Sequence, residues 1–86
     1  MRLDKFLKVS RIIKRRTVAN EACDSERVMI NGRMAKASTH VKVGDVVEIK
    51  FGEKTFKFQV LLVDEIVKKE DTAQMYRMME ESSSQN

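Results

Sequence analysis

The dipeptide Asn31-Gly32 constrains the fold of this chain more than any other feature of its sequence. It follows the apolar run Val28-Met29-Ile30, and an Asn-Gly pair after such a run is the strongest short-range signal for a tight β-hairpin turn. A second hairpin is predicted from residues 46–51 and 56–63, which are rich in β-branched and aromatic residues and flank a turn at residues 51–54. The sequence therefore predicts a small antiparallel sheet.

The last predicted strand has a regular pattern. Apolar Phe56, Phe58 and Val60 alternate with Lys57 and Gln59. This period of two is typical of a strand with one buried face, so these aromatic residues are predicted to lie in the core. The alternative is that they form a platform on which nucleic-acid bases stack.

Two short helices are predicted before the first hairpin. The first covers residues 3–13, and the second begins at Thr17, whose hydroxyl suits an N-cap position, and ends at residues 24–26. The predicted buried face of the first helix, at steps of three and four, comprises Leu3, Phe6, Leu7, Ser10 and Ile13. That of the second comprises Val18, Ala22 and Cys23.

A further helix is predicted over residues 71–81. Asp71 and Gln74 have the spacing of a capping box, and the apolar residues of this segment are Ala73, Met75, Tyr76 and Met79. This helix either packs on the second hairpin or presents a methionine-rich surface to a partner. Residues 82–86 are polar and predicted to be disordered.

The charged residues are distributed unevenly along the chain. Residues 1–16 contain seven Lys and Arg against one Asp, a net charge of +6, whereas residues 17–63 carry +1 and residues 64–86 carry −3. Basic charge clustered in this way attracts a polyanion, and nucleic acid is the usual cytoplasmic polyanion. A solvated helix face is the alternative.

The predicted basic surface lies opposite the apolar face of the first helix. Its residues are Arg2, Lys5, Lys8, Arg11, Lys14 and Arg15, and Arg16 directly follows them. Asp4 is the acidic exception, and it can either serve the free N–H groups of the first helical turn or pair with a neighbouring Lys or Arg.

Catalytic chemistry finds little support in this chain of 86 residues, which is long enough for one domain only. Cys23 is the single cysteine and is predicted to be a core residue, while His40, the single histidine, is predicted to lie in a surface loop without a catalytic partner. The sequence has no glycine-rich phosphate loop, metal-ligand spacing or acid/base pair. We therefore expect no enzymatic activity, no metal and no cofactor.

Targeting signals are also lacking in the sequence. No apolar stretch has the length of a signal peptide or of a membrane span, and one cysteine cannot form an intrachain disulfide. We therefore expect a cytoplasmic protein without a membrane partner.

Several motifs together resemble the RNA-binding domain named after ribosomal protein S4. The match covers residues 1 to about 51, and its motifs are Arg2-Leu3-Asp4-Lys5-Phe6-Leu7, Ser10-Arg11, Lys14-Arg15-Arg16-Thr17, Val28-Met29-Ile30-Asn31-Gly32, Lys36-Ala37-Ser38 and Val43-Gly44-Asp45. The resemblance implies an α+β fold with two short N-terminal helices packed on a small antiparallel sheet. With the second hairpin and the C-terminal helix, it predicts an RNA-binding domain at residues 1–63, a helical extension at 64–81 and a tail at 82–86.

Among proteins with this domain, the chain most resembles the bacterial RqcP group, relatives of the heat-shock protein 15 family, almost from end to end. The resemblance implies a monomeric factor of ribosome-associated quality control that binds the large ribosomal subunit carrying a stalled peptidyl-tRNA. Such a factor contacts both rRNA and tRNA and supports alanine tailing by a partner protein.

The resemblance also assigns roles to individual residues. The resemblance implies RNA binding, with Asp4 orienting Arg2 or another basic residue, for Arg2, Arg11, Lys14, Arg15, Arg16 and Lys36. The charge pattern adds Lys5 and Lys8 to these candidates. One departure is that the family usually has a glycine just before the first strand, where this chain has Glu26-Arg27. Because a left-handed backbone is costly without glycine, the geometry of this loop is a point to check.

Three alternatives remain open. The chain could be a recycling factor like heat-shock protein 15, without a role in tailing. It could instead be the appended domain of an rRNA-modifying enzyme such as a pseudouridine synthase, although 86 residues leave no room for a catalytic domain. Finally, it could be a protein-interaction module that works through its acidic, methionine-bearing C-terminal segment.

Overall fold

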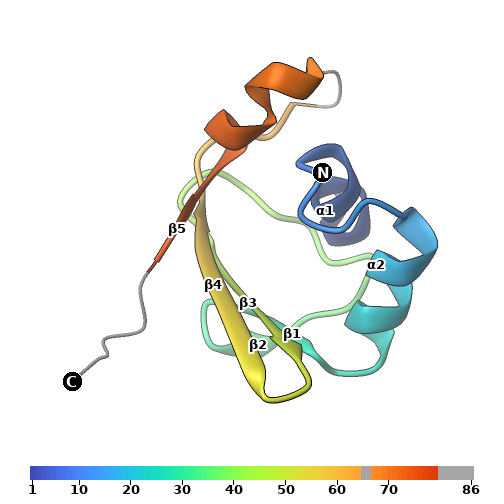
Figure 1. Ribbon diagram of the computed structural model, residues 1–86. Helices are drawn as coiled ribbons and strands as arrows, with labels where there is room; N and C mark the ends of the chain where they lie inside the picture. The colour runs from blue at the N-terminus through green and yellow to red at the C-terminus, as the bar shows by residue number, and fades with distance from the viewer. Residues whose placement is uncertain (65–66, 80–86) are drawn as a thin grey trace.

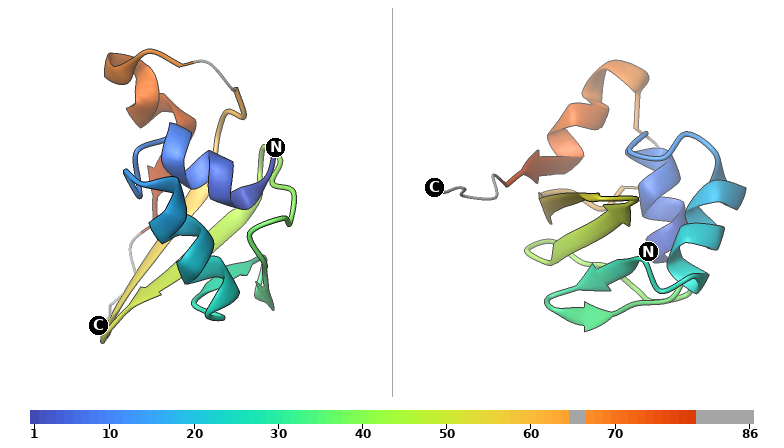
Figure 2. Two further views of the ribbon diagram at one scale, coloured as in Figure 1. Left: turned by 90° about the vertical axis from the view of Figure 1, so that its right-hand side faces the viewer. Right: turned by 60° about the horizontal axis from the view of Figure 1, so that its bottom comes forward.

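The computed structural model describes residues 1–64 and 67–79. Its elements are α1 (Leu3–Val9), α2 (Arg16–Asp24), β1 (Val28–Ile30), β2 (Arg33–Met34), β3 (Val46–Phe51), β4 (Lys54–Val60), the 3-10 helix η1 (Lys69–Met75) and β5 (Tyr76–Met78). The strands form one antiparallel sheet in the order β2-β1-β3-β4-β5. Both α-helices lie on the same side of this sheet (Figures 1 and 2). The predicted α+β architecture is confirmed.

The first hairpin has the predicted turn. Asn31 and Gly32 both adopt positive φ angles, 53° and 83°, as the favoured two-residue hairpin turn requires. The Asn31 side chain also holds the turn against the start of β3, because its Nδ2 donates to Asp45 Oδ1 at 3.1 Å and its Oδ1 accepts from the Val46 N–H at 2.9 Å. The Asn31 side chain therefore anchors the turn through both its amide nitrogen and its amide oxygen.

The core lies between the helices and the sheet. At its centre the rings of Phe6 and Phe58 are stacked, with centroids 6.2 Å apart. The fully buried apolar side chains are Leu3, Phe6, Leu7, Ala19, Val28, Val47, Ile49, Phe58, Val60 and Met75. Each large side chain buried in this way contributes about 1.5–3 kcal/mol to folding, so the packing of the two helices on the sheet holds the domain together.

The first helix is shorter than predicted. It ends at Val9, with Ser10 as its C-cap, because Arg11 adopts a left-handed conformation with φ 65°. Ile13 nevertheless reaches the core, since its N–H donates to the Leu7 carbonyl at 3.1 Å and so folds the chain back. The prediction of a helix to residue 13 was wrong, while the prediction that Ile13 is buried is confirmed.

The second helix differs at its first turn. It begins at Arg16, and no side chain caps it, so Thr17 is not the N-cap residue. Val18 is 41% exposed whereas Ala19 is fully buried, because the buried face follows Ala19, Ala22 and Cys23 at steps of three and four, so the prediction that Val18 is buried was wrong. Ala22 and Cys23 are buried as predicted.

At the loop Glu26-Arg27, a residue other than glycine adopts the left-handed conformation. Glu26 adopts φ 62° directly after the end of α2, and the Arg27 N–H donates to the Ala22 carbonyl at 3.1 Å. This is the usual left-handed end of a helix, in which glycine is preferred. The left-handed backbone of Glu26 therefore costs roughly 1 kcal/mol of folding free energy.

The C-terminal segment does not form the predicted α-helix. Residues 69–75 form the 3-10 helix η1, whose N-cap residue is Lys68, and Asp71 makes no capping bond. Residues 76–78 form β5, which pairs with β4 and so satisfies that strand's edge. The reason lies in packing: Met75 is fully buried and the Tyr76 ring meets Phe58 edge to face at 5.6 Å. The prediction for residues 80–86 lies outside the described residues.

The second hairpin forms as predicted, although β4 ends at Val60 and not at residue 63. Its alternation places Phe58 and Val60 in the core, but Phe56 is 40% exposed. Phe56 lies near the turn of the hairpin, which projects beyond the helices (Figures 1 and 2). The prediction that both aromatic residues of this strand lie in the core was therefore wrong for Phe56. In the described part of the chain, no helix has the length and hydropathy needed to cross a membrane.

Candidate nucleic-acid interface

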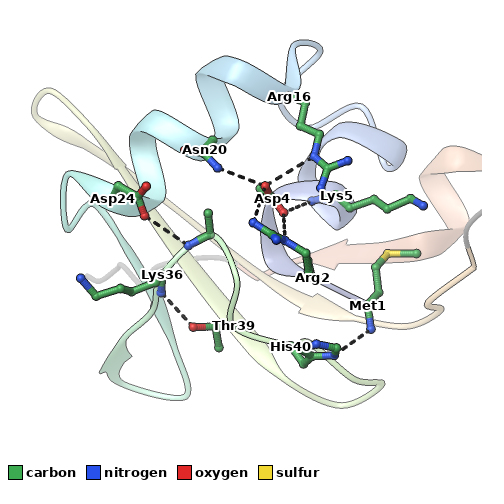
Figure 3. A network of polar contacts seen from close by, with 11 residues as sticks. Met1, Arg2, Asp4, Lys5, Arg16, Asn20, Asp24, Lys36, Thr39 and His40 are labelled. Carbon is green, nitrogen blue, oxygen red and sulfur yellow. Dashed lines mark hydrogen bonds and ion pairs between the residues drawn. The ribbon is translucent and has the colours of Figure 1, made fainter.

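A cluster of polar contacts centred on Asp4 joins α1 to α2 (Figure 3). The Asp4 side chain is 2% exposed. Its Oδ1 accepts from Arg2 Nε at 3.1 Å and from the Lys5 N–H at 2.8 Å, and its Oδ2 accepts from Arg16 Nε at 3.4 Å and Asn20 Nδ2 at 3.2 Å. Asp4 thus both serves an N–H of the first helical turn and pairs with arginine, so the two alternatives for this residue hold together.

The backbone at Arg2 is fixed by a distant loop. Arg2 and His40 form an antiparallel bridge, the Val41 N–H donates to the Met1 carbonyl at 2.8 Å, and the Leu3 N–H donates to the Thr39 carbonyl at 2.7 Å. The loop therefore sets the position of Arg2, and the carboxylate of Asp4 sets the direction of its side chain. His40 is exposed, as predicted.

The electrostatics of the cluster favour a charged Asp4. Burial raises the pKa of its carboxyl, but hydrogen bonds from Asn20 and Arg2, the charge of Arg16 and the Lys5 N–H outweigh this and hold the pKa below its ordinary value of 3.8. Asp4 is therefore ionised at neutral pH, and its charge holds both guanidinium groups in place.

Arg2 and Arg16 keep nearly half of their side-chain surface accessible, 45% and 48%. They flank an open hollow whose lining residues are Arg2, Asp4, Arg16, Thr17, Asn20 and Glu21. A fixed guanidinium can present its planar fork of N–H donors to phosphate oxygens. The arrangement is suited to binding a phosphate backbone, and the carboxylate between the two arginines is almost completely buried.

Asn20 was not predicted as a site residue. It is four residues after Arg16, so the two lie on the same face of α2. An amide at this spacing from a basic residue was the available signal in the sequence, although only the fold shows that Asp4 is the group both residues reach.

The remaining predicted site residues are more scattered. Lys8, Arg11, Lys14, Arg15 and Lys36 are exposed. Lys5 is half-buried, and its side chain points away from Asp4 in Figure 3, as does that of Lys36. Since α1 ends at Val9, residues 11, 14 and 15 belong to the α1–α2 connection and do not continue a helical stripe. In the described part of the chain, Arg2 and Arg16 are the two predicted basic residues whose guanidinium groups bond to Asp4.

Other chemistry is not supported by the geometry. Cys23 is buried, and burial, followed by the charges of Asp4 and Asp24, raises the pKa of its thiol to about 12. This thiol is protonated at neutral pH and unsuited to act as a nucleophile. Within residues 1–64 and 67–79, no three His, Cys, Asp or Glu side chains are grouped so as to hold a metal ion.

Comparison with protein families finds that the S4 domain matches residues 1–47. The chain is 56% identical to the RQC P-site tRNA stabilizing factor of Streptococcus pneumoniae over 95% of this chain and 93% of that protein. The corresponding values for the factor of the same name from Bacillus subtilis are 53%, 94% and 94%. The Heat shock protein 15 homolog of Haemophilus influenzae is 29% identical, over 96% of this chain and 63% of that protein.

Solved structures are similar over nearly the whole chain. The trimeric structure of Vibrio cholerae Heat Shock Protein 15 superposes with a TM-score of 0.84 at 26% identity, covering 95% of this chain and 84% of that one. The solution structure of the hypothetical protein HP1423 gives a TM-score of 0.79 at 32% identity, covering 93% and 98%. The chain therefore belongs to the S4-domain family of RQC P-site tRNA stabilizing factors, which are RNA-binding proteins and not enzymes.

Proposed function

We propose that this protein binds obstructed large ribosomal subunits by contacting both rRNA and peptidyl-tRNA, and that it supports alanine tailing of the stalled chain by a partner protein. The names of its relatives, which refer to P-site tRNA and to RQC, support the tRNA contact and the pathway. A ribosomal partner makes the cytoplasm the expected location. The fold and the basic surface of residues 2–16 support RNA as the direct ligand.

The observation that carries this proposal is the shared carboxylate of Asp4. It holds Arg2 and Arg16 on one side of the helix pair with nearly half of each side chain accessible. Two arginine side chains held in this way lose little conformational entropy when they bind phosphate. They are the residues we expect to contact the RNA backbone most closely, with Asp4 as the orienting residue.

The other basic residues have a supporting role in this proposal. They are Lys5, Lys8, Arg11, Lys14, Arg15 and Lys36. Five of them are exposed and Lys5 is half-buried, and in this proposal they attract RNA and contact phosphates without reading sequence, which suits A-form RNA. Each phosphate that the protein neutralises adds about 0.7–0.9 to the slope of log affinity against log salt concentration, and we expect a footprint of roughly four to six phosphates.

The test is sedimentation of the tagged protein with ribosomal particles on a sucrose gradient. We expect co-migration with large subunits that contain peptidyl-tRNA, and loss of co-migration for Arg2→Ala and for Arg16→Ala. Arg33→Ala is the matched control, because Arg33 is an exposed arginine on β2 and the substitution makes the same change in charge. Absence of the wild-type protein from every ribosomal fraction at low salt would overturn the proposal.

A recycling factor without a role in tailing is the second candidate, favoured by the likeness to Heat Shock Protein 15. A reconstituted tailing reaction separates the two, because only the first candidate lengthens alanine tails in a manner that depends on Arg2 and Arg16. We expect the protein to act as a monomer. Light scattering tests this point, which matters because the Vibrio cholerae structure is trimeric.

The protein-interaction alternative needs a truncation that leaves the fold intact. Removing residues 71–86 would delete β5 and the buried Met75, so any loss of binding would reflect unfolding. Truncation after Met79 keeps every described element. We expect this variant to retain RNA binding, whereas a module that works through its C-terminal residues would lose its activity.

A further inference from the structure

We propose that the tip of the second hairpin, residues 50–57, forms a second RNA contact on which an unpaired base stacks against Phe56. This inference deepens the proposed function, because it rests on RNA being the ligand. It concerns a different part of the molecule from the Asp4 cluster. The S4-domain match ends at residue 47, so the tip lies outside the matched domain.

The geometry of the tip leaves an aromatic ring accessible. Phe56 is 40% exposed, and its ring meets that of Phe51 edge to face, with centroids 5.7 Å apart and an interplanar angle of 68°. Phe51 is directly opposite Lys54 in the register of the two strands. Alternation along β4 places Lys54 and Phe56 on the same face of the sheet, so a ring supported by a second ring lies beside a cation.

The charge of the tip suits a polyanion. Residues 50–57 contain Lys50, Lys54 and Lys57 against Glu53 alone. Lys50 and Lys54 are exposed, and Lys57 is half-buried. A base stacked on Phe56 would bring its own phosphates within reach of Lys54, which shares its face of the sheet, while Lys50 and Lys57 on the other face add to the positive charge of the tip. An aromatic platform beside basic groups is the usual arrangement for binding single-stranded nucleic acid.

The same observations argue against a protein partner at this place. The cores of protein interfaces are depleted of lysine, yet lysine is the most frequent residue of the tip. The accessible apolar surface here is essentially one ring, which is far smaller than a stable protein interface needs. A role in hairpin stability alone would be served by the Phe51–Phe56 contact without leaving Phe56 accessible.

The absence of tryptophan from the sequence makes the contact directly measurable. In the variant F56W, the only tryptophan would stand at the proposed stacking position. We titrate this full-length variant with a short single-stranded oligoadenylate and expect its fluorescence to be quenched, with a midpoint equal to that of the anisotropy of labelled RNA. The control is Leu61→Trp, because Leu61 is similarly exposed, at 43%, but follows the other end of β4.

A second pair of variants tests the contribution of the ring to affinity. Loss of one stacked base corresponds to a weakening of about fivefold or more. We therefore expect Phe56→Leu, which keeps apolar packing against Phe51, to bind the oligonucleotide about fivefold less tightly, while Phe56→Tyr binds as the wild type does. Circular dichroism verifies that both variants are folded. Lys54→Gln should lower the salt-dependence slope by about 0.7, and Glu53→Gln should not lower it.

The outcomes separate this inference from the proposed function. If RNA binds but the tryptophan of F56W is not quenched, or if Phe56→Leu binds normally, the hairpin contact is refuted and the Asp4 cluster remains the RNA site. If Phe56→Leu loses ribosomal particles yet binds oligonucleotide normally, the tip contacts protein and the inference is equally refuted. If the wild-type protein binds neither RNA nor ribosomal particles, both proposals fail.

Discussion

Replacing Asp4 by asparagine should weaken RNA binding even though it makes the protein more basic. The substitution raises the formal net charge from +4 to +5, so simple attraction to a polyanion would increase affinity. If Asp4 acts by positioning the two arginines, affinity should fall instead, because an amide cannot hold the guanidinium groups of both Arg2 and Arg16 as a carboxylate does. The sign of the change therefore decides between the two explanations.

The cost in stability follows from the contacts of Asp4. The hydrogen bonds from Asn20 and the Lys5 N–H contribute about 1 kcal/mol each. The pairs with Arg2 and Arg16 contribute about 0.5 kcal/mol each, because both partners are nearly half exposed. Asparagine keeps one acceptor oxygen, so we expect Asp4→Asn to lose about 2 kcal/mol, or about 10 °C in Tm for a domain of this size.

The loss should depend on pH in a defined direction. The folded pKa of Asp4 is lowered, so its stabilisation is complete above the unfolded pKa of about 4 and disappears as pH falls through the folded value. We therefore expect the difference in Tm between wild type and Asp4→Asn to be full at pH 7 and to shrink below about pH 4.

Thermal unfolding followed by circular dichroism, with RNA binding followed by anisotropy, provides the test. Asp24→Asn is the control, because it makes the same change in charge at an exposed residue that accepts one bond of 3.5 Å from the Ala37 N–H. Its Tm should change by less than about 2 °C. If Asp4→Asn binds RNA as tightly as Asp24→Asn does, the positioning role of Asp4 is refuted.

Three further predictions concern the scaffold. Because the Cys23 thiol is buried and its pKa is raised to about 12, a thiol reagent at pH 8 should modify it only as fast as the protein opens, and rapid labelling of the folded protein would contradict this. Glu26→Gly should raise Tm by about 5 °C by relieving the left-handed backbone, whereas Arg27→Gly should lower it. Gly32→Ala should lower Tm by a similar amount, since φ is 83° there; an unchanged Tm would show that the turn adapts.

Local signals in the sequence were sufficient for the central part of the fold. The Asn31-Gly32 turn and the second hairpin depend on short-range preferences, and the structure has both. The C-terminal segment was mispredicted because a capping-box spacing and helical periodicity compete there with an unpaired sheet edge. The buried Met75 and the pairing of β5 with β4 prevail, and no local pattern reports the availability of that edge.

The candidate site was predictable in composition but not in arrangement. Clustered charge identified the basic residues at positions 2–16, and Asp4 stood out as the one acid among them. Which arginines share Asp4, and that Asn20 joins them, depends on the packing of α2 across α1. The exposure of Phe56 likewise depends on how far the hairpin extends past the helices, a distance that residue alternation along β4 does not encode.

The docking of the loop at residues 37–41 on the N-terminus has a consequence for how the RNA-binding surface comes into existence. Helix α1 has seven residues and no side-chain cap, and two of its first N–H groups donate to carbonyls of Ala37 and Thr39. So short a helix is not stable in isolation. The surface that presents Arg2 therefore exists only when segments far apart in the sequence are packed together, and RNA that binds it should in turn stabilise the folded domain.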